Sequence, residues 1–117
     1  FGHALEAITG YGGELLHGEA VAIGMTLAFD LSCLRGHCPI DDVDRVKAHL
    51  DAVDLRTSAK TLQTEITAEA MLDAMSLDKK VEAGIPRFVL VNGIGQAFHG
   101  AEVDQQQLCD FLNAKLA

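Results

Sequence analysis

The segment Glu19–Leu34 is apolar almost all round, interrupted only by Thr26, Asp30 and Ser32. A helix with this pattern is normally buried in the middle of a domain rather than laid on its surface. The pattern therefore predicts a central helix over about residues 17–35, around which the rest of the chain is organised.

One face of this helix carries only small side chains, because Ala20, Gly24 and Ala28 are four residues apart. Glycine in a helix interior costs roughly 1 kcal/mol against alanine, and the segment carries two glycines, Gly18 and Gly24. We expect that packing or a ligand needs the room, and that another backbone approaches the helix closely on this side.

The flanking segments predict four shorter helices and one hairpin. The four helices are the end of a helix over 3–9, closed by the glycine turn 10–13; a helix from Asp41 or Asp42 to about Val53; a helix capped by Thr67; and a helix capped by Asp104. Residues 55–64 are predicted to form a loop. The hairpin consists of strands over 87–91 and 96–99 around an Asn92-Gly93 turn. Gly36 should close the central helix. The third helix should bury Val43, Val46, Leu50 and Val53. The fold class predicted is mainly α, a helical bundle-like domain with a small β-hairpin.

Composition narrows the class of protein. At 117 residues the chain fits one domain, and a net charge of -8 argues against binding nucleic acid or an anionic membrane surface. Asp30 and Arg35 interrupt the longest apolar run, so we expect no membrane-spanning helix. Three cysteines, an odd number without paired spacing, suit a reducing cytoplasm. The chain begins at Phe1, inside an apolar periodic segment without a cap, so we expect a fragment of a longer protein.

His3 and His17 are the first candidates for chemistry. They flank the glycine turn at the open ends of two helices, so they could face one cavity. An imidazole is a good zinc ligand and suits proton transfer, but two histidines leave a zinc site incomplete, and a capping or core histidine is the alternative. Glu6 and Glu19 are either partners that orient these histidines or simple helix-end and surface charges.

Lys79 and Lys80, which follow Asp78, are the second candidates. Adjacent lysines on a loop can hold a phosphate or carboxylate as point charges, although a solvated charged turn would look the same. A third group, Cys33, His37 and Cys38, resembles a metal cluster only superficially, because no fourth ligand is evident.

Taken together and in order, four separated motifs resemble the C-terminal domain of the 3-dehydroquinate synthase family. They are residues 1–7 (FGHALEA), 16–25 (LHGEAVAIGM), 77–80 (LDKK) and 87–90 (RFVL) with 94–95 (IG). Related sugar-phosphate cyclases share much of this pattern. Glycerol and iron-dependent alcohol dehydrogenases share the architecture more distantly.

The resemblance implies a lyase of the shikimate pathway, which leads to chorismate and the aromatic amino acids. The family cyclises the seven-carbon keto sugar-acid phosphate DAHP to 3-dehydroquinate, with NAD and a divalent metal, zinc or cobalt, held by one glutamate and two histidines. His17 matches the second metal histidine, and His3 matches a catalytic histidine implicated in proton transfer. Lys79 and Lys80 match a lysine pair of which at least one contacts substrate. The parent protein is expected to be a cytoplasmic homodimer.

The departures from the family pattern limit what this chain is expected to do alone. The other metal histidine belongs to a Gly-His-x-Phe-Gly-His pattern, and this chain starts at its Phe. The metal glutamate and the NAD-binding domain would also lie upstream, so residues 1–117 are expected to form only the metal- and substrate-binding α-helical domain, without cofactor-binding residues and inactive by itself. Two alternatives stay open: a free-standing helical metal-binding or interaction module with His3 and His17 as ligands, or a fragment of a related dehydrogenase.

Overall fold

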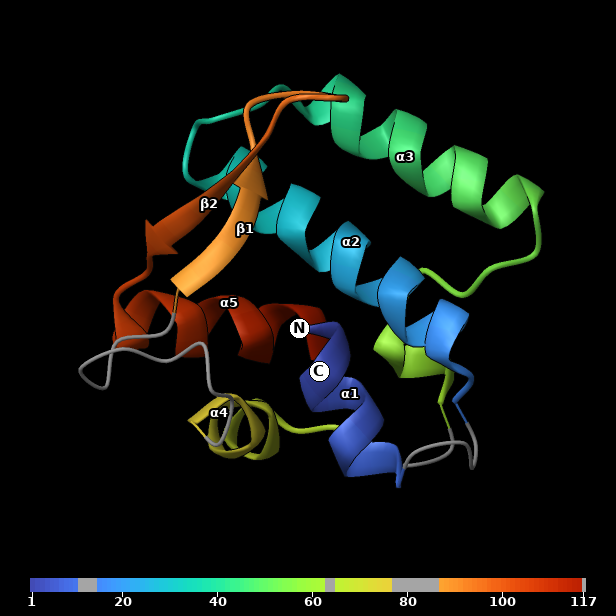
Figure 1. The fold of residues 1–117 in the computed structure, drawn as a ribbon, viewed down its shortest axis with the longest axis vertical. Helices are drawn as coiled ribbons and strands as arrows, with labels where there is room; N and C mark the ends of the chain where they lie inside the picture. Colours follow the sequence, from blue (N-terminus) through green and yellow to red (C-terminus); the bar gives the residue numbers. More distant parts are fainter. Residues whose placement is uncertain (11–14, 63–64, 77–86, 117) are drawn as a thin grey trace.

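The computed structural model describes residues 1–10, 15–62, 65–76 and 87–116. Within these ranges the chain forms five α-helices, one short 3-10 helix and one antiparallel hairpin (Figure 1). In chain order they are α1 (Gly2–Thr9), α2 (His17–Leu34), α3 (Ile40–Ala52), η1 (Ala59–Thr61), α4 (Ala68–Ser76), β1 (Arg87–Val91), β2 (Ala97–Glu102) and α5 (Gln105–Leu116). The prediction of a mainly α-helical domain with a small hairpin is confirmed.

Helix α2 is the centre of the molecule, as the sequence predicts. It runs through the middle of the fold with α3 along one side and α1 on the other, and β1 packs against it as well (Figure 1). Ile23, Leu27 and Leu31 of α2 are at most 5% exposed. They belong to a core that also includes Leu5 of α1, Met71 of α4, Leu90 of β1, and Leu108 and Leu112 of α5.

One stripe of α2 departs from this prediction. Val21 and Met25, four residues apart, are 41% and 45% exposed. Both line a cavity rather than the core. The described residues therefore do not cover α2 on every side. The sequence pattern does not show this, because apolar residues that line a cavity and apolar residues in a packed core look the same in the sequence.

Gly36 closes the C-terminal end of α2, as the sequence predicts. Gly36 has φ of +79°, a left-handed conformation that glycine adopts without a Cβ penalty. Its N–H donates to the Cys33 carbonyl at 3.0 Å, and the His37 N–H donates to the Ser32 carbonyl at 2.8 Å. This pair of bonds is the Schellman motif, which satisfies carbonyls that the helix itself leaves unpaired.

Two details predicted for α3 are wrong. Pro39 occupies the N-cap position without a side-chain hydrogen bond, and Asp41 and Asp42 lie inside the first turn. Carboxylates there interact favourably with the helix dipole instead of capping the helix. Val53 is 53% exposed because it follows the last helical residue and so leaves the helical repeat that buries Val43 and Leu50.

The hairpin is longer than its sequence pattern suggests. β2 extends to Glu102, three residues past the predicted end, and the connection is a loop in which the Asn92 N–H donates to the Gln96 carbonyl at 2.9 Å. The register shifts between Phe88 and Leu90. Arg87, at the open end, pairs with Glu102 at 2.9 Å.

A buried hydroxyl fastens the hairpin to the central helix. Ser32 is fully buried, donates to the Ala28 carbonyl at 2.7 Å and accepts the Val91 N–H at 2.9 Å. The strand amide at the end of β1 is thereby satisfied by α2. Elsewhere, the predicted caps of α4 and α5 are confirmed, since Thr67 and Asp104 accept backbone N–H groups of the following turns at 3.1 and 3.2 Å. Among the described helices none is long and apolar enough to cross a membrane.

Candidate active site at the start of the central helix

A cavity of about 590 Å³ lies beside the first half of α2. Its polar lining comes from His3, Glu6, His17, Arg87 and Gln96. The prediction that the two histidines on either side of the glycine turn face one cavity is therefore confirmed. A largely apolar cavity with a few convergent polar groups is the usual form of a small-molecule site.

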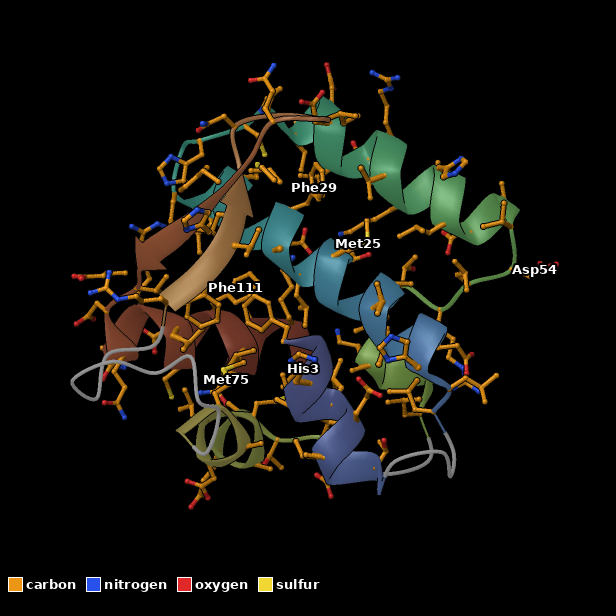
Figure 2. The ribbon with its side chains drawn as sticks, in the orientation of Figure 1. His3, Met25, Phe29, Asp54, Met75 and Phe111 are labelled. Atoms are coloured by element: carbon orange, nitrogen blue, oxygen red, sulfur yellow. The ribbon has the colours of Figure 1, made fainter. Side chains whose placement is uncertain are left out.

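The apolar wall of the cavity comes from several elements. Val21, Met25 and Phe29 of α2 line it together with Met75 of α4. Figure 2 shows the labelled residues His3, Met25, Phe29 and Met75, which come from α1, α2 and α4. The exposed stripe of the central helix is thus one face of the candidate site.

His3 is placed by an unusually close contact between α1 and α2. A Cβ on Gly24 would lie 2.9 Å from the backbone nitrogen of Gly2, and one on Gly2 would lie 3.2 Å from the Ala20 carbonyl oxygen. The predicted close approach of a second backbone at the small residues of α2 is confirmed, and that backbone is the first turn of α1. Gly18 differs, because nothing among the described residues lies within 4 Å of a Cβ there.

Aromatic stacking holds the same turn from the other side. The Phe1 ring lies 5.0 Å from the ring of Phe88 in β1 and 6.1 Å from that of Phe111 in α5, centroid to centroid. Both distances fall in the range of favourable aromatic pairs. The residues that precede His3 are therefore fixed against α2, β1 and α5 together.

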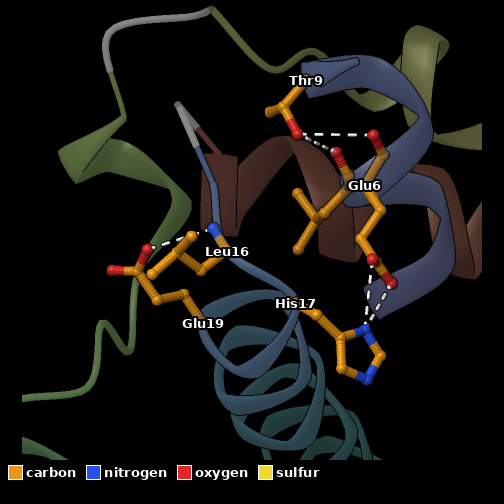
Figure 3. A network of polar contacts seen from close by, with 6 residues as sticks. Glu6, Thr9, Leu16, His17 and Glu19 are labelled. Atoms are coloured by element: carbon orange, nitrogen blue, oxygen red, sulfur yellow. Dashed lines mark hydrogen bonds and ion pairs between the residues drawn. The ribbon is translucent and has the colours of Figure 1, made fainter. Parts of the chain in front are cut away.

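His17 is the first residue of α2, and a carboxylate from α1 holds its ring. The His17 Nδ1 atom lies 3.1 and 3.2 Å from the two carboxylate oxygens of Glu6 (Figure 3). The His17 side chain is 73% exposed, whereas that of Glu6 is 14% exposed. The ring reaches toward solvent and the cavity while the carboxylate that holds it is largely buried.

Glu19 has a different task from Glu6. Its carboxylate accepts the Leu16 N–H at 3.2 Å, directly before the helix (Figure 3). It also pairs with Arg56 Nε at 2.9 Å. Of the two carboxylates that the sequence offers as histidine partners, Glu6 contacts His17, and Glu19 fixes the helix start and the segment that carries Arg56.

Lys79 and Lys80 lie outside the described residues. The helix residue Met75 before them and the strand residue Arg87 after them both line the cavity. Arg87 and Gln96 were missed as lining residues. The sequence signals for Arg87 are that it starts a predicted strand close behind the lysine pair and that it belongs to the family-like motif at residues 87–90. Gln96 gives no such signal.

The superficial Cys33–His37–Cys38 cluster is not a metal site among the described residues. Cys38 is buried and its thiol donates to the Phe29 carbonyl at 3.8 Å, while the His37 ring packs edge-on against Phe98. Burial raises the pKa of the Cys38 thiol, with Cys33 and the nearby carboxylates adding to the shift. A neutral buried thiol is a poor metal ligand.

No group of three or more His, Cys, Asp or Glu side chains in the described part of the chain could hold a metal ion. A single metal ligand, however, is compatible with the geometry at His17. The His17 imidazole is held through Nδ1, and in histidine metal ligands the nitrogen that does not bind the metal is commonly held by a carboxylate in this way. The residues present fit a partial site, to which this chain would contribute one imidazole.

The family model described as 3-dehydroquinate synthase C-terminal matches residues 1–81, more than half of the chain. The chain belongs to this family. Curated relatives named 3-dehydroquinate synthase extend the likeness over the whole chain: one from Ruegeria pomeroyi is 47% identical over 118 residues, and one from Rhodospirillum rubrum is 50% identical over 119. Both alignments cover 100% of this chain but 32% and 31% of the relative, so the chain spans about a third of their length.

Solved structures agree on the fold. A 2-deoxy-scyllo-inosose synthase, complexed with carbaglucose-6-phosphate, NAD+ and Co2+, has a TM-score of 0.72 at 18% identity and covers 98% of this chain and 33% of its own. A second structure of a 2-deoxy-scyllo-inosose synthase gives 0.69 at 21% identity, with 98% and 30% covered. The family match and the curated relatives do not favour a free-standing module or a dehydrogenase fragment.

Proposed function

We propose that this chain is the C-terminal, metal- and substrate-binding part of a 3-dehydroquinate synthase, which cyclises DAHP to 3-dehydroquinate with loss of phosphate. The observation that carries the proposal is that His3 and His17, from two separate motifs within the matched residues 1–81, line one cavity. The NAD-binding part would be supplied by sequence outside this chain. The proposal includes the shikimate pathway as its setting.

His17 is assigned as one ligand of a divalent metal, zinc or cobalt. Its ring is anchored by Glu6 through Nδ1 and exposed over most of its surface, as a ligand completed by groups from elsewhere requires. The bound metal would polarise the substrate. NAD+ and Co2+ in the solved 2-deoxy-scyllo-inosose synthase support this cofactor pair.

His3 is assigned to proton transfer at its imidazole. It lines the same cavity as His17 but stands on α1, whose first turn is fixed by the contact between Gly2 and Gly24. A general acid–base group must be held within reach of the proton that it moves, and this rigid turn provides such a position.

The proposed substrate, DAHP, carries two anionic groups, a carboxylate and a phosphate. Arg87 lines the cavity and also pairs with Glu102 at 2.9 Å, and we assign Lys79 or Lys80 to an anionic group of the substrate. The three cysteines form no disulfide among the described residues, which supports a cytoplasmic location. We propose a homodimer as the assembly, with neither nucleic acid nor membrane as a partner.

Metal analysis of two histidine variants in the full-length enzyme tests the proposal. The enzyme can come from the source gene or from a hybrid that joins this chain to the upstream part of the Rhodospirillum rubrum relative. His17→Ala should lose metal and activity together. His3→Ala should keep the metal and lower kcat by about 10²–10⁴-fold, the usual contribution of a general acid–base group.

His49→Ala is the matched control, because His49 is exposed on α3 and is not part of the cavity lining. It should keep both metal and turnover. Equal metal loss in His3→Ala and His17→Ala would show that the roles are wrongly assigned. Full activity in both variants would refute the proposed function of this site.

A further inference from the structure

We propose that Glu6 is a positioning residue for the metal ligand His17: it fixes the tautomer and the orientation of the imidazole so that Nε2 is presented to the metal. The inference rests on the proposed function, since it needs His17 to be a ligand. The role assigned to Glu6 is exerted through the ring of His17, which it contacts at Nδ1.

The geometry assigns the proton on the ring. Both oxygens of Glu6 lie within 3.2 Å of Nδ1, so the carboxylate straddles this one nitrogen. An ionised carboxylate can only accept hydrogen bonds. Nδ1 must therefore carry the hydrogen, and in the neutral ring the lone pair is then on Nε2, which is the atom that a metal needs.

Burial shows which partner holds the other. The Glu6 side chain is 14% exposed, and it follows Leu5, which is fully buried in the core. The His17 side chain is 73% exposed, at the first residue of its helix. A ring with so few neighbours would sample several rotamers without Glu6, and a pair this exposed on one side contributes little to stability. Orientation of the ring is what the contact can supply.

The other carboxylate at this helix end makes the assignment specific. Glu19 is taken up by the Leu16 N–H and by Arg56, so it secures the start of α2 and not the ring. Substitution of Glu19 loosens the helix start without touching Nδ1. The two glutamates therefore separate a structural effect on α2 from a specific effect on the imidazole.

The test uses the full-length enzyme freed of metal and titrated with Co2+, whose visible spectrum reports the ligand set. Glu6→Gln should weaken Co2+ binding by about 10–100-fold, as loss of a partner to a metal-bound histidine typically does. The amide of Gln can donate to Nδ1 and so favours the wrong tautomer. Glu6→Asp keeps the charge and should recover part of the affinity. Glu19→Gln should lower the thermal unfolding midpoint but leave Co2+ affinity unchanged.

A second readout does not depend on bound metal. Nitrogen NMR of the metal-free enzyme labelled at histidine should show the His17 ring protonated on Nδ1, and Glu6→Gln should move that proton toward Nε2. Co2+ affinity in Glu6→Gln equal to wild type, or an equal loss in Glu19→Gln, overturns the inference. His17→Ala distinguishes failure of this inference from failure of the proposed function. If His17→Ala loses Co2+ while Glu6→Gln does not, only the role of Glu6 is wrong. If His17→Ala keeps Co2+, the assignment of His17 as a metal ligand is wrong.

Discussion

Gly24 of α2 lies so close to Gly2 of α1 that a Cβ at position 24 would stand 2.9 Å from the Gly2 backbone nitrogen. A Cβ essentially never approaches backbone this closely, so the contact requires that residue 24 lacks one, and a Cβ at Gly2 would itself be tight, 3.2 Å from the Ala20 carbonyl oxygen. It brings the first turn of α1, and with it His3, against the helix that begins with His17. The relative position of the two histidines thus depends on a glycine pair.

Gly24→Ala should therefore destabilise the protein and disturb catalysis. Overpacking against backbone typically costs about 1–3 kcal/mol, of which the better helix propensity of alanine offsets roughly 1 kcal/mol. Displacement of the turn that carries His3 should also lower kcat, by up to about 10²-fold for a shift on the order of 1 Å. Thermal unfolding and steady-state kinetics of the full-length enzyme measure both effects.

Gly18→Ala is the matched control for stability. It lies in the same helix, but nothing among the described residues lies within 4 Å of its Cβ position. The unfolding midpoint should stay unchanged or rise. A midpoint for Gly24→Ala at or above that of Gly18→Ala would contradict the close-contact argument.

Ser32→Ala should weaken the attachment of the hairpin to α2. The substitution leaves the buried Val91 N–H without its acceptor, which typically costs about 1–3 kcal/mol. Thr26→Val is the control, because the Thr26 hydroxyl is equally buried but only donates to the Ala22 carbonyl of its own helix. Amide hydrogen exchange at Val91 should accelerate in Ser32→Ala and not in Thr26→Val. Equal exchange in the two variants would show that the Ser32 contact does not hold the strand.

Much of the fold follows from local rules that the sequence displays. The central helix, its glycine end at Gly36, and the caps Thr67 and Asp104 depend on residues within one or two turns of each other. The sequence also predicts that His3 and His17 share one cavity, but the placement depends on the contact between Gly2 and Gly24, because His3 lies at the end of α1 away from the start of α2.

What could not be predicted depends on contacts between distant elements. The sequence offered Glu6 and Glu19 equally as partners of a histidine, and only the crossing of α1 and α2 gives the ring to Glu6, eleven residues from His17. The exposure of Val21 and Met25 could not be predicted from the sequence for a similar reason. An apolar residue facing a cavity has the same identity as one facing the core, so hydrophobicity alone cannot separate them.

Cys38 should be the least reactive of the three cysteines. Burial raises the pKa of its thiol, and the neighbouring Cys33, Asp42 and Asp30 raise it further, so little of the nucleophilic thiolate is present near pH 8. Timed alkylation followed by peptide mass spectrometry should label the half-buried Cys33 and Cys109 first. Labelling of Cys38 at the rate of Cys109 in the folded protein would contradict this.

The same shift predicts a direction for stability against pH. The folded state keeps the Cys38 proton at a pH where the unfolded chain releases it, so stability is complete below the ordinary thiol range and falls as pH rises through it. Cys38→Ala should flatten this alkaline loss in thermal unfolding, and Cys109→Ala should leave it in place. An unchanged alkaline slope in Cys38→Ala would exclude Cys38 as the group responsible.

Lys79 and Lys80 provide the sharpest test of the substrate site. The helix before them and the strand after them both line the cavity, through Met75 and Arg87. Adjacent residues rarely point the same way, and we therefore expect unequal roles. In the full-length enzyme each lysine is changed singly to methionine, which keeps most of the apolar stem and removes the charge. One variant should lose about 2–4 kcal/mol in kcat/KM, as when one partner of a desolvated charge pair is removed. The other should stay close to wild type, as surface charges usually do. Wild-type kcat/KM in both variants would mean that the pair forms a solvated turn, and the anion would then have to be held by Arg87 or by residues outside this chain.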